Sequence, residues 1–436
     1  MLAPFRNLFR IPEVRRRILW TVGILVLFRV GSHVPLPGVD PAALRSFAEQ
    51  ASQAMGGLWG YLQLFSGGAI GHLALFSLGI APAITASIIV QLLGKVHPAL
   101  EAISRQGPSG QRRIQQITRY VTVPVCLLQA SVTVWNLFDV ESQPPLLAAR
   151  TFANALLLVA GLTGGAMILQ WLGEQITERG VGNGASILIM AGIVSRLPAL
   201  LGEMARRTRE GLLGPDAFAF VVVLYLAAVV AMVFISKAQR RIPLQHASHV
   251  RGRRLQGGGR NYLPIRILSA GVMPLIFAST ALILPELLGR LPGMDWLRFL
   301  SRDFGFISTL FQVVAILFFS FFWTYVFFRP SDLALQLREN GSFVPGLRPG
   351  EVTAAYLDGI LCRITLCGGV ILATIAILPG FLAHALRLDH LLESFLGGSS
   401  LLIVVGVVLD LLQKCDSWLL MHHYRGFLDR GGGKLK

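Results

Sequence analysis

The chain has 436 residues, of which 53% are hydrophobic and 14% carry a charge, and its formal net charge is +16. A water-soluble fold of this length exposes more polar surface than this composition supplies. The composition therefore excludes a soluble globular protein and predicts a membrane protein with several spans. Because no polar run is long enough for a separate domain, we expect a single membrane domain over 1–436, with halves at 1–205 and 206–436.

Ten apolar runs have the length that a helix needs to cross the hydrocarbon core of a bilayer, about 17 to 25 residues. Pro35 to Gly38, directly after the first run, lack the small-residue pattern of a cleavage site, so we expect this run to stay in the protein. In chain order the runs lie at 18–35, 73–93, 118–138, 151–172, 183–201, 217–236, 265–288, 306–328, 360–383 and 399–421.

A short segment from Gly56 to Gly68 separates the first run from the second and has glycines near both ends. It is too short to cross a bilayer, and its glycines can act as hinges. The segment is typical of a short helix that sits in a cavity and swings away, as a plug does. An interfacial turn is the alternative interpretation.

The second run begins with a phrase that the seventh run repeats. Gly79 to Ser87 and Gly271 to Ser279 share the pattern Gly-x-x-Pro-x-Ile-x-Ala-Ser. Glycine and proline are common in membrane helices, but a whole phrase at matched positions indicates a duplicated unit whose copies meet at a central pathway.

Lysine and arginine gather in the amino-terminal tail and in the connections after the second and sixth runs. The positive-inside rule places these segments, and with them both termini, in the cytoplasm. Arginines after the fifth and seventh runs oppose this assignment, although acidic residues are interleaved with them. Five runs in each half invert the second half relative to the first. The sequence thus predicts an all-α membrane protein with ten transmembrane helices, in two inverted five-helix halves around a central pore with a short plug helix.

Titratable residues are few in the apolar runs. Arg29, Glu174, Asp410 and Lys414 lie toward helix ends, and no carboxylate pair or histidine relay occurs at mid-depth. A secondary transporter with five-plus-five inverted repeats is the alternative function, and it requires an ion site at mid-depth. Because no catalytic, cofactor or metal-binding motif occurs, we expect no enzymatic activity, no cofactor and no metal.

Branched aliphatic residues occupy the middle of the repeated phrase instead. Ile80, Ile84 and Ile276 are joined by Ile189 and Ile403 in other runs. A ring of such side chains closes a pore by dewetting. A single isoleucine is more often a packing or lipid-facing residue, and it is the repeat that favours a pore ring here.

Seven arginines and no acidic residue lie between Arg240 and Arg266. Such a segment attracts anionic lipid, RNA or an acidic protein surface. The positive-inside rule alone is the alternative explanation, but the density of charge favours docking.

The order and the amino-acid sequences of these segments resemble those of the SecY family, the pore subunit of the protein-conducting channel, from one terminus to the other. The stretches that carry the resemblance include Pro35 to Asp40, Leu64 to Gly68, Leu78 to Pro82, Gln175 to Gly184, Ala238 to Pro243 and Phe343 to Gly350.

The resemblance implies the central channel subunit of the SecYEG translocase, located in the cytoplasmic (inner) membrane of a bacterium. Such a channel conducts unfolded polypeptides across the membrane and releases transmembrane segments sideways into lipid. The partners that the resemblance implies are the subunits SecE and SecG, the SecA motor ATPase, the ribosome, precursor proteins with a signal sequence, and anionic lipid.

The resemblance also implies four groups of site residues. The pore ring consists of Ile80, Ile84, Ala185, Ile189, Ile276 and Ile403. The plug covers about 57–71 and includes Leu58, Tyr61, Leu64, Phe65, Ser66, Gly67 and Gly68. The lateral gate, between spans two and three and spans seven and eight, includes Ser87, Gln129, Leu268, Ser269 and Ile276. The docking surface for the motor or ribosome includes Arg240, Arg241, Arg251, Arg253, Arg254 and Arg348.

Two positions depart from the family pattern. Ala185 replaces the usual aliphatic ring residue, so we expect either a looser seal there or compensation by a neighbouring residue. Leu268 stands where the family often has an asparagine of a polar gate cluster, so we expect a more apolar gate.

Overall fold

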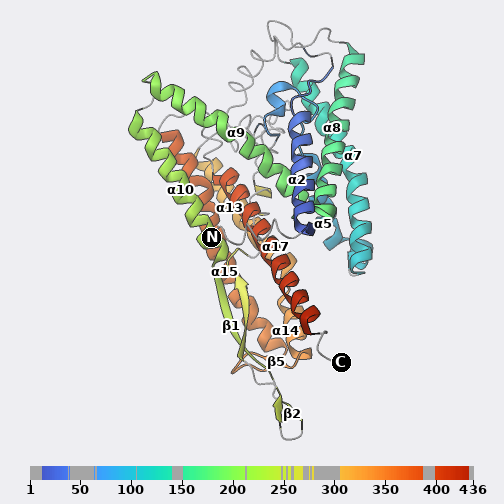
Figure 1. Cartoon of the computed structure of the whole chain (residues 1–436), viewed down its shortest axis with the longest axis vertical. Coiled ribbons are helices and arrows are strands. Elements are labelled where there is room, and N and C mark those ends of the chain that lie inside the picture. The colour runs from blue at the N-terminus through green and yellow to red at the C-terminus, as the bar shows by residue number, and fades with distance from the viewer. Residues whose placement is uncertain are drawn as a thin grey trace. The chain divides into compact units, whose positions relative to one another are not determined.

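The computed structural model describes residues 12–37, 39, 63, 66–104, 106–139, 151–211, 214–246, 249–251, 254–256, 260–268, 274, 277–278, 305–385 and 398–431. The chain forms two compact units, one of Met1–Glu210 with Val407–Lys436 and one of Gly211–Gly406 (Figure 1). The predicted single domain with halves at 1–205 and 206–436 stays a prediction.

Helices make up most of the first unit. They pack in sequence, α5 against α7, α7 against α8 and α8 against α9, while α2 lies against α8. Their bounds are α2 (Pro12–Gly31), α5 (Ala81–Val96), α6 (Pro98–Ser104), α7 (Pro108–Asp139), α8 (Phe152–Arg179) and α9 (Gly184–Arg209).

The connection between α8 and α9 is short because its residues form hydrogen bonds with backbone groups at the end of α8 and at the start of α9. Asn183 caps α9, since its side-chain oxygen accepts hydrogen bonds from the backbone nitrogens of Ala185 and Ser186 at 3.1 and 3.4 Å. A Cβ on Gly184 would overlap the carbonyl group of Gly173, so only glycine lets α9 start this close to α8.

The segment before α5 is not a regular helix. Residues 66–80 form turns around a short 3₁₀ helix, η1 (Ala69–His72), and Gly79 adopts a φ of 60° just before α5 begins. Pro82 lies in the first turn of α5. Backbone N–H groups in this turn have no acceptor within the helix, so proline, which lacks an N–H, loses no hydrogen bond there. The first copy of the repeated phrase therefore marks a helix start, and the second predicted span is helical only from Ala81.

The second unit combines helices with strands. Its elements are α10 (Pro215–Lys237), β1 (Gln239–His246), β2 (His249–Arg251), β3 (Arg254–Gln256), β4 (Arg260–Arg266), α13 (Phe306–Phe327), α14 (Pro330–Glu339), β5 (Ser342–Phe343) and α15 (Glu351–Ala385). The last helix, α17 (Gly398–Gly431), begins in this unit and continues into the first.

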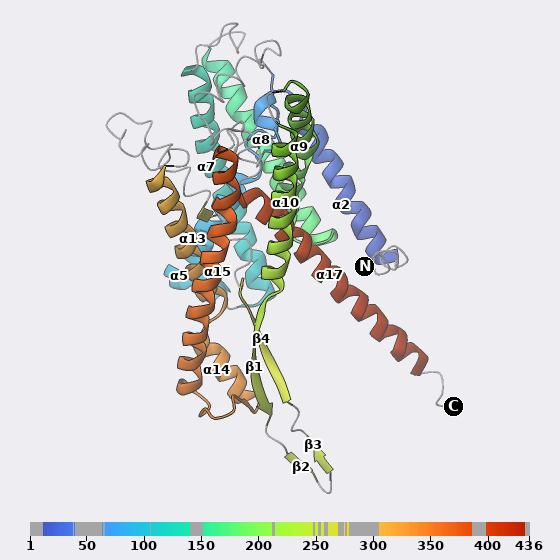
Figure 2. The ribbon, with the colours of Figure 1, turned by 90° about the vertical axis from the view of Figure 1, so that its left-hand side faces the viewer.

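An antiparallel sheet of order β4-β1-β5 replaces the loops expected after spans six and eight. Figure 2 shows β1 and β4 as a long pair beyond the end of α10. Ile242 pairs with Leu263, and Gln245 pairs with Phe343 of β5. The predicted all-α class is wrong in this part, and the chain is a mostly helical membrane protein. The seventh span also begins later than predicted, because 265–266 belong to β4.

One face of this sheet is buried on helix α15. Ile242 and Leu244 from β1, Ile265 from β4 and Val344 after β5 form one apolar cluster with residues of α15 such as Leu361. Alternation along β1 puts Ile242 and Leu244 on the same face and Arg241 on the opposite, exposed face.

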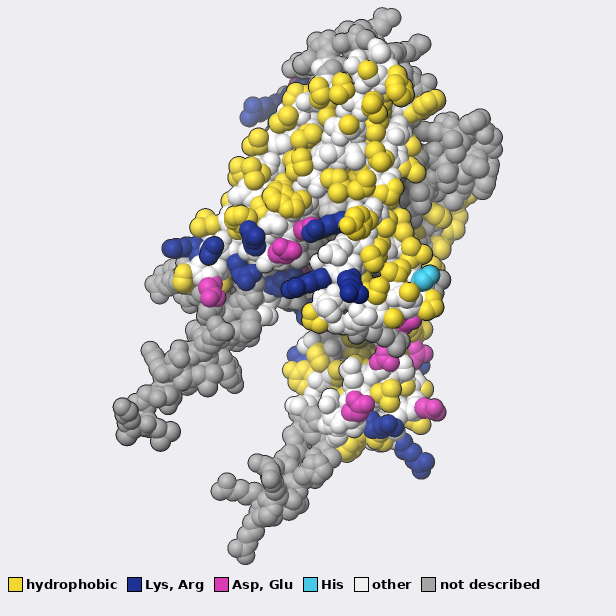
Figure 3. Space-filling view, turned by 90° about the vertical axis from the view of Figure 1, so that its right-hand side faces the viewer, with side chains coloured by type: hydrophobic (Ala, Val, Ile, Leu, Met, Phe, Trp, Pro, Cys, Tyr) yellow, Lys and Arg dark blue, Asp and Glu magenta, His cyan; other side chains and the backbone are white. Residues whose placement is uncertain are grey.

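The helices are apolar enough to lie in a bilayer. Among the described residues, six helices are long and apolar enough to cross a membrane, and the bent pair Ala81–Gly94 and Pro98–Ser104 brings the number to seven. Figure 3 shows apolar side chains over a broad area of one face, with charged side chains gathered below it. Several membrane spans are thus present, while the number ten stays a prediction.

Candidate functional site

The predicted ring residues of the first unit gather around the start of α5 and the start of α9. Ile80 precedes α5 and is only 4% exposed. A Cβ built on Gly173 of α8 would lie 3.4 Å from Cδ1 of Ile80 and 3.6 Å from the backbone nitrogen of Ala185. The small Gly173 therefore lets Ile80 and the first turn of α9 approach the same point of α8.

The other ring residues are distributed over both units. Ile84 and Ala185 are half-buried, and Ile189 is buried at 1% exposure in α9. Ile403 is buried in α17, while Ile276 lies outside the described residues. The complete ring thus stays a prediction, as does the looser seal at Ala185.

Only the last part of the predicted plug is described. Leu58, Tyr61, Leu64 and Phe65 lie outside the described residues. Ser66 is buried, and its hydroxyl donates to the carbonyl of Gln63 at 3.4 Å and accepts from the backbone nitrogen of Ile70 at 3.4 Å. Gly67 and Gly68 follow with φ values of 63° and 86°, which favour glycine.

Two arginines from different helices meet this glycine turn. Arg29, in the last turn of α2, donates from Nη1 to the carbonyl oxygen of Gly67 at 3.2 Å and to Oγ of Ser195 at 3.3 Å. The guanidinium group of Arg196 covers the point where a Cβ of Gly68 would lie. The side chain of Arg29 is thus turned into the unit and onto the turn.

Two histidines lie beside these arginines. The rings of His33 and His72 stack with their centroids 6.0 Å apart. The pKa of His72 is lowered from its ordinary value of 6.5 by partial burial, and further by the charges of Arg196, His33 and Arg29. The end of the turn is therefore a region of positive charge.

The predicted lateral gate is described in part. Ser87 lies on α5, where its hydroxyl accepts from Nε2 of Gln91 at 2.9 Å, and Gln129 lies half-buried on the adjacent α7. Leu268 lies in the turn after β4, and Ser269 and Ile276 lie outside the described residues. Ser87 and Gln129 are therefore on packed helices, and the gate as a whole stays a prediction.

The sheet joins the two predicted docking segments into one structure. Arg240 and Arg241 lie exposed on β1, and the guanidinium carbon of Arg241 lies 4.8 Å from the ring centroid of Tyr262 on β4. Arg348 is exposed in the turn between β5 and α15, where its carbonyl accepts from the hydroxyl of Thr353 at 2.8 Å.

Pairing of β5 with β1 brings the segments after spans six and eight together. The sequence analysis assigned both segments to one docking surface but did not predict the strands that join them. Arg251 ends β2 and Arg254 begins β3, while Arg253 lies outside the described residues. Their role in docking stays a prediction.

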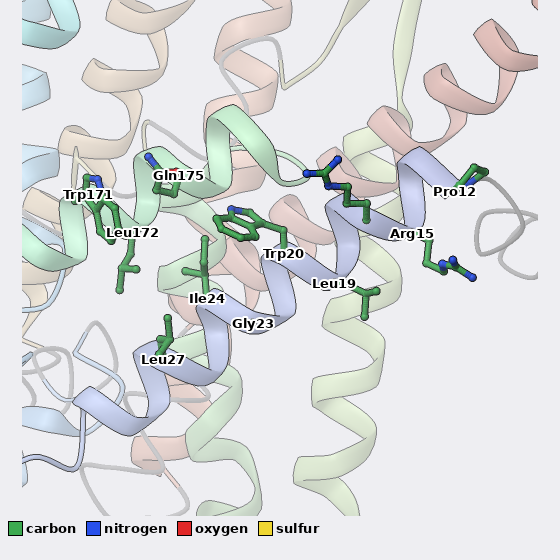
Figure 4. Close-up of a pocket in the computed structure, with 11 residues that line it drawn as sticks. Pro12, Arg15, Leu19, Trp20, Gly23, Ile24, Leu27, Trp171, Leu172 and Gln175 are labelled. Atoms are coloured by element: carbon green, nitrogen blue, oxygen red, sulfur yellow. The ribbon is translucent and has the colours of Figure 1, made fainter.

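A groove of about 710 Å³ lies between α2 and α8 (Figure 4). Trp20 and Ile24 of α2 face Trp171 and Leu172 of α8 across it. Its walls are mostly apolar, and Arg15 and Arg16 lie toward its amino-terminal end. Such a groove suits an apolar occupant rather than a polar substrate.

Among the described residues the structure contains no group of three or more His, Cys, Asp or Glu side chains that could hold a metal ion. The charged contact between α7 and α8 is a single pair, in which Nε of Arg119 donates to Oε1 of Glu174 at 2.8 Å. This pair ties two helices together and does not form the mid-depth ion site that the transporter alternative requires.

Arg196 is the site residue that sequence reasoning missed. It lies inside the fifth predicted span, and a single charge in an otherwise apolar run was the signal that marked it. His72 and Ser195 carried no comparable signal, because their roles come from contacts with Arg196 and Arg29.

Comparison with known proteins agrees with this arrangement. The protein-family model described as SecY matches residues 74–412. The protein translocase subunit SecY of Thermotoga maritima is 37% identical over 437 residues, which cover 99% of this chain and 99% of that protein. The chain belongs to the SecY family. The predicted function of a protein-conducting channel subunit, rather than an enzyme, is thereby confirmed.

Solved structures confirm the SecY channel fold. A structure titled as that of a protein conducting channel has a TM-score of 0.64 and 18% identity, and covers 94% of this chain and 95% of its own. Sec61 in the canine ribosome-channel complex from the endoplasmic reticulum has a TM-score of 0.60 and 17% identity, and covers 94% and 95%. At these identities the likeness establishes the fold alone.

Proposed function

We propose that this chain is the central subunit of the SecYEG translocase in the cytoplasmic (inner) membrane of a bacterium, with both termini in the cytoplasm. It conducts unfolded polypeptides across that membrane and releases transmembrane segments sideways into lipid. The observation that carries this proposal is the 37% sequence identity with the SecY subunit of Thermotoga maritima, in an alignment that covers 99% of both chains. The apolar surface of the helices and the basic surface of the sheet support it.

The architecture proposed is one membrane domain with ten transmembrane helices in two inverted five-helix halves. The helices that match predicted spans, such as α10 and α13, support this count. The phrase shared by 79–87 and 271–279 supports the inversion, because it recurs in the corresponding span of each half.

In the closed channel, the pore ring of Ile80, Ile84, Ala185, Ile189, Ile276 and Ile403 excludes water and ions. Branched aliphatic side chains offer water no hydrogen bonds, so a narrow ring of them dewets. The plug at about 57–71 covers the ring on the outer side. Ile80 and Ile189 are buried near the starts of α5 and α9, which supports a fixed position for this part of the ring. A passing polypeptide displaces this part only locally.

The lateral gate lies between spans two and three on one side and seven and eight on the other. Ser87 and Gln129 on the packed helices α5 and α7 supply polar groups on the first side, and Leu268 makes the second side more apolar. A signal sequence or transmembrane segment that parts these helices reaches lipid directly.

The energy for transport comes from a partner, because the chain carries no catalytic motif. SecA or the ribosome docks on the sheet surface that carries Arg240, Arg241 and Arg348, where exposed guanidinium groups meet acidic protein or RNA. SecE and SecG complete the channel, and anionic lipid binds the remaining basic residues.

Transport by reconstituted chain tests this function. The chain is placed in liposomes with SecE and SecG, and SecA, ATP and a precursor with a signal sequence are added. We expect the precursor to become protected from protease, and Arg348→Glu to abolish protection, since charge reversal at an exposed docking residue repels an acidic partner.

Arg209→Glu is the matched control, because it makes the same charge change at the exposed end of α9, outside the two docking segments. Protection should persist in this variant. Lack of protection with the unaltered chain, in vesicles where another SecYEG works in parallel, would refute the proposed function.

A further inference from the structure

The turn at Gly67 and Gly68 divides a fixed segment from the part of the plug that precedes it. Beyond the turn, the backbone nitrogen of Leu75 donates to the carbonyl of Val34 at 2.9 Å, and that of Leu36 donates to the carbonyl of Leu73 at 3.0 Å. These bonds tie 73–75 to the extension of α2. The two glycines, with φ values of 63° and 86°, lie directly before this fixed segment.

The turn is held from outside by two rigid helices. Gly67 lies so close to α9 that a Cβ on it would be 3.0 Å from Cα of Gly192 and 3.2 Å from the ring of Phe28. Arg29 reaches the same residue from α2 and binds its carbonyl oxygen, and Arg196 covers Gly68 from α9. The turn is thus enclosed by two helices and two guanidinium groups.

This arrangement holds the turn without fixing it permanently. In the part of the chain that the structure describes, Arg29 donates to two neutral acceptors, the carbonyl of Gly67 and the hydroxyl of Ser195, and neither Arg29 nor Arg196 forms an ion pair. A hydrogen bond from a charged donor is stronger than one between neutral groups. Repulsion between the positive charges of Arg29 and Arg196, and the hydration that both groups lose on burial, weaken this contact. A contact with these opposing terms suits a position that must both hold and release.

We propose that Arg29 and Arg196 anchor the Gly67–Gly68 turn and thereby hold the plug in its closed position, and that both contacts break when the channel opens. The inference rests on the proposed function, because the plug at about 57–71 belongs to that proposal. Arg29 and Arg196 are positioning residues, since they act on the plug through the glycine turn and do not line the pore ring.

The test measures how often the turn opens. Ser66 is 2% exposed, so a cysteine at this position reacts with a membrane-impermeant maleimide only when the turn leaves its site. Ser66→Cys is made in the full chain with Cys126, Cys362, Cys367 and Cys415 changed to serine, and the protein is reconstituted with SecE and SecG. We expect Arg29→Gln to raise the labelling rate about ten- to a hundredfold, the effect of one lost hydrogen bond to a charged group. Arg196→Gln should also raise the rate, because it removes the guanidinium group that covers Gly68.

Two controls separate the anchor from a general loss of structure. Thr208→Ala removes a hydroxyl from the same helix α9 that donates to the carbonyl of Met204, away from both arginines, so the labelling rate should not change. Arg207→Gln removes a positive charge from the same helix α9 at a residue that binds Glu203, and should not change the rate either.

Lysine variants keep the test decisive if a glutamine variant fails to fold. Arg29→Lys and Arg196→Lys retain the charge but donate from a single point, so we expect labelling rates between those of the parent and the glutamine variants. Parental labelling rates in every folded variant at both arginines would overturn the anchor.

Precursor transport by the Ser66→Cys parent, measured in the same vesicles, distinguishes the two proposals. Transport with unchanged labelling of the arginine variants refutes the anchor alone. Absence of transport in the parent refutes the proposed function, while the ratio of labelling rates still decides whether the arginines hold the turn.

Discussion

Two kinds of charged contact occur in the first unit. Arg119 pairs with the carboxylate of Glu174, so the charges of α7 and α8 neutralise each other. Arg29 instead donates to a backbone carbonyl and a hydroxyl, and its charge stays uncompensated by these contacts. The sequence placed Arg29 and Glu174 toward helix ends, but it did not reveal their partners. Contacts between residues so far apart in the chain depend on helix packing.

The environment of His72 predicts a pH dependence of the turn. Partial burial and the nearby charges of Arg196, His33 and Arg29 lower its pKa below the ordinary 6.5. The folded state thus binds the proton less well than the unfolded state. Stability is complete above pH 6.5 and is lost as the pH falls through the lowered pKa. Hydrogen exchange of 66–80 should therefore be faster at pH 5 than at pH 7.5, after correction for intrinsic rates.

His72→Gln provides the control for this dependence, because glutamine does not titrate. The part of the exchange that depends on pH should shrink in this variant. A variant with the same pH dependence as the parent would assign the effect to other groups, such as His33, whose ring stacks on that of His72.

The sheet of the second unit shows what strand alternation does to a basic segment. Along β1 the side chains of Ile242 and Leu244 point to the apolar cluster on α15, whereas Arg241 and Pro243 stay exposed. The sequence contains this alternation, but the density of arginines led us to interpret the segment as a basic docking segment and not as strands. The pairing of β1 with β5 was not predictable from local pattern, because α13 and α14 separate the two strands in the chain.

Ile265→Ala tests whether this cluster fixes the sheet. Ile265 is 1% exposed within the cluster, and its truncation should lower local stability by about 2–5 kcal/mol. Hydrogen exchange of β1 and β4 should accelerate, and SecA-driven transport should fall if the arginines proposed to dock SecA lose the support of the sheet. Tyr262→Ala on the exposed face is the control and should change sheet exchange much less. Equal acceleration in both variants would contradict a core on one face alone.

The proposed pore ring draws residues from both units of the chain. Ile80, Ile84, Ala185 and Ile189 belong to the first unit, and Ile276 and Ile403 belong to the second.

Ile84→Ser tests this seal. A hydroxyl in an apolar constriction favours water, so the ion leak of vesicles with the variant should rise severalfold over the parent. Ile168→Ser is the matched control, since Ile168 is 45% exposed on α8, away from the predicted ring. Equal leak in the two variants would argue against Ile84 as a ring residue.

The sequence by itself determined the membrane class and the position of most helices. The predicted spans 217–236 and 306–328 correspond to α10 (Pro215–Lys237) and α13 (Phe306–Phe327), because a continuous apolar run is a local property of the chain. Only the tertiary structure decided that Arg29 and Arg196 meet the Gly67–Gly68 turn and that β5 pairs with β1. Such contacts join residues that are distant in sequence, and their energies depend on packing that no local pattern encodes.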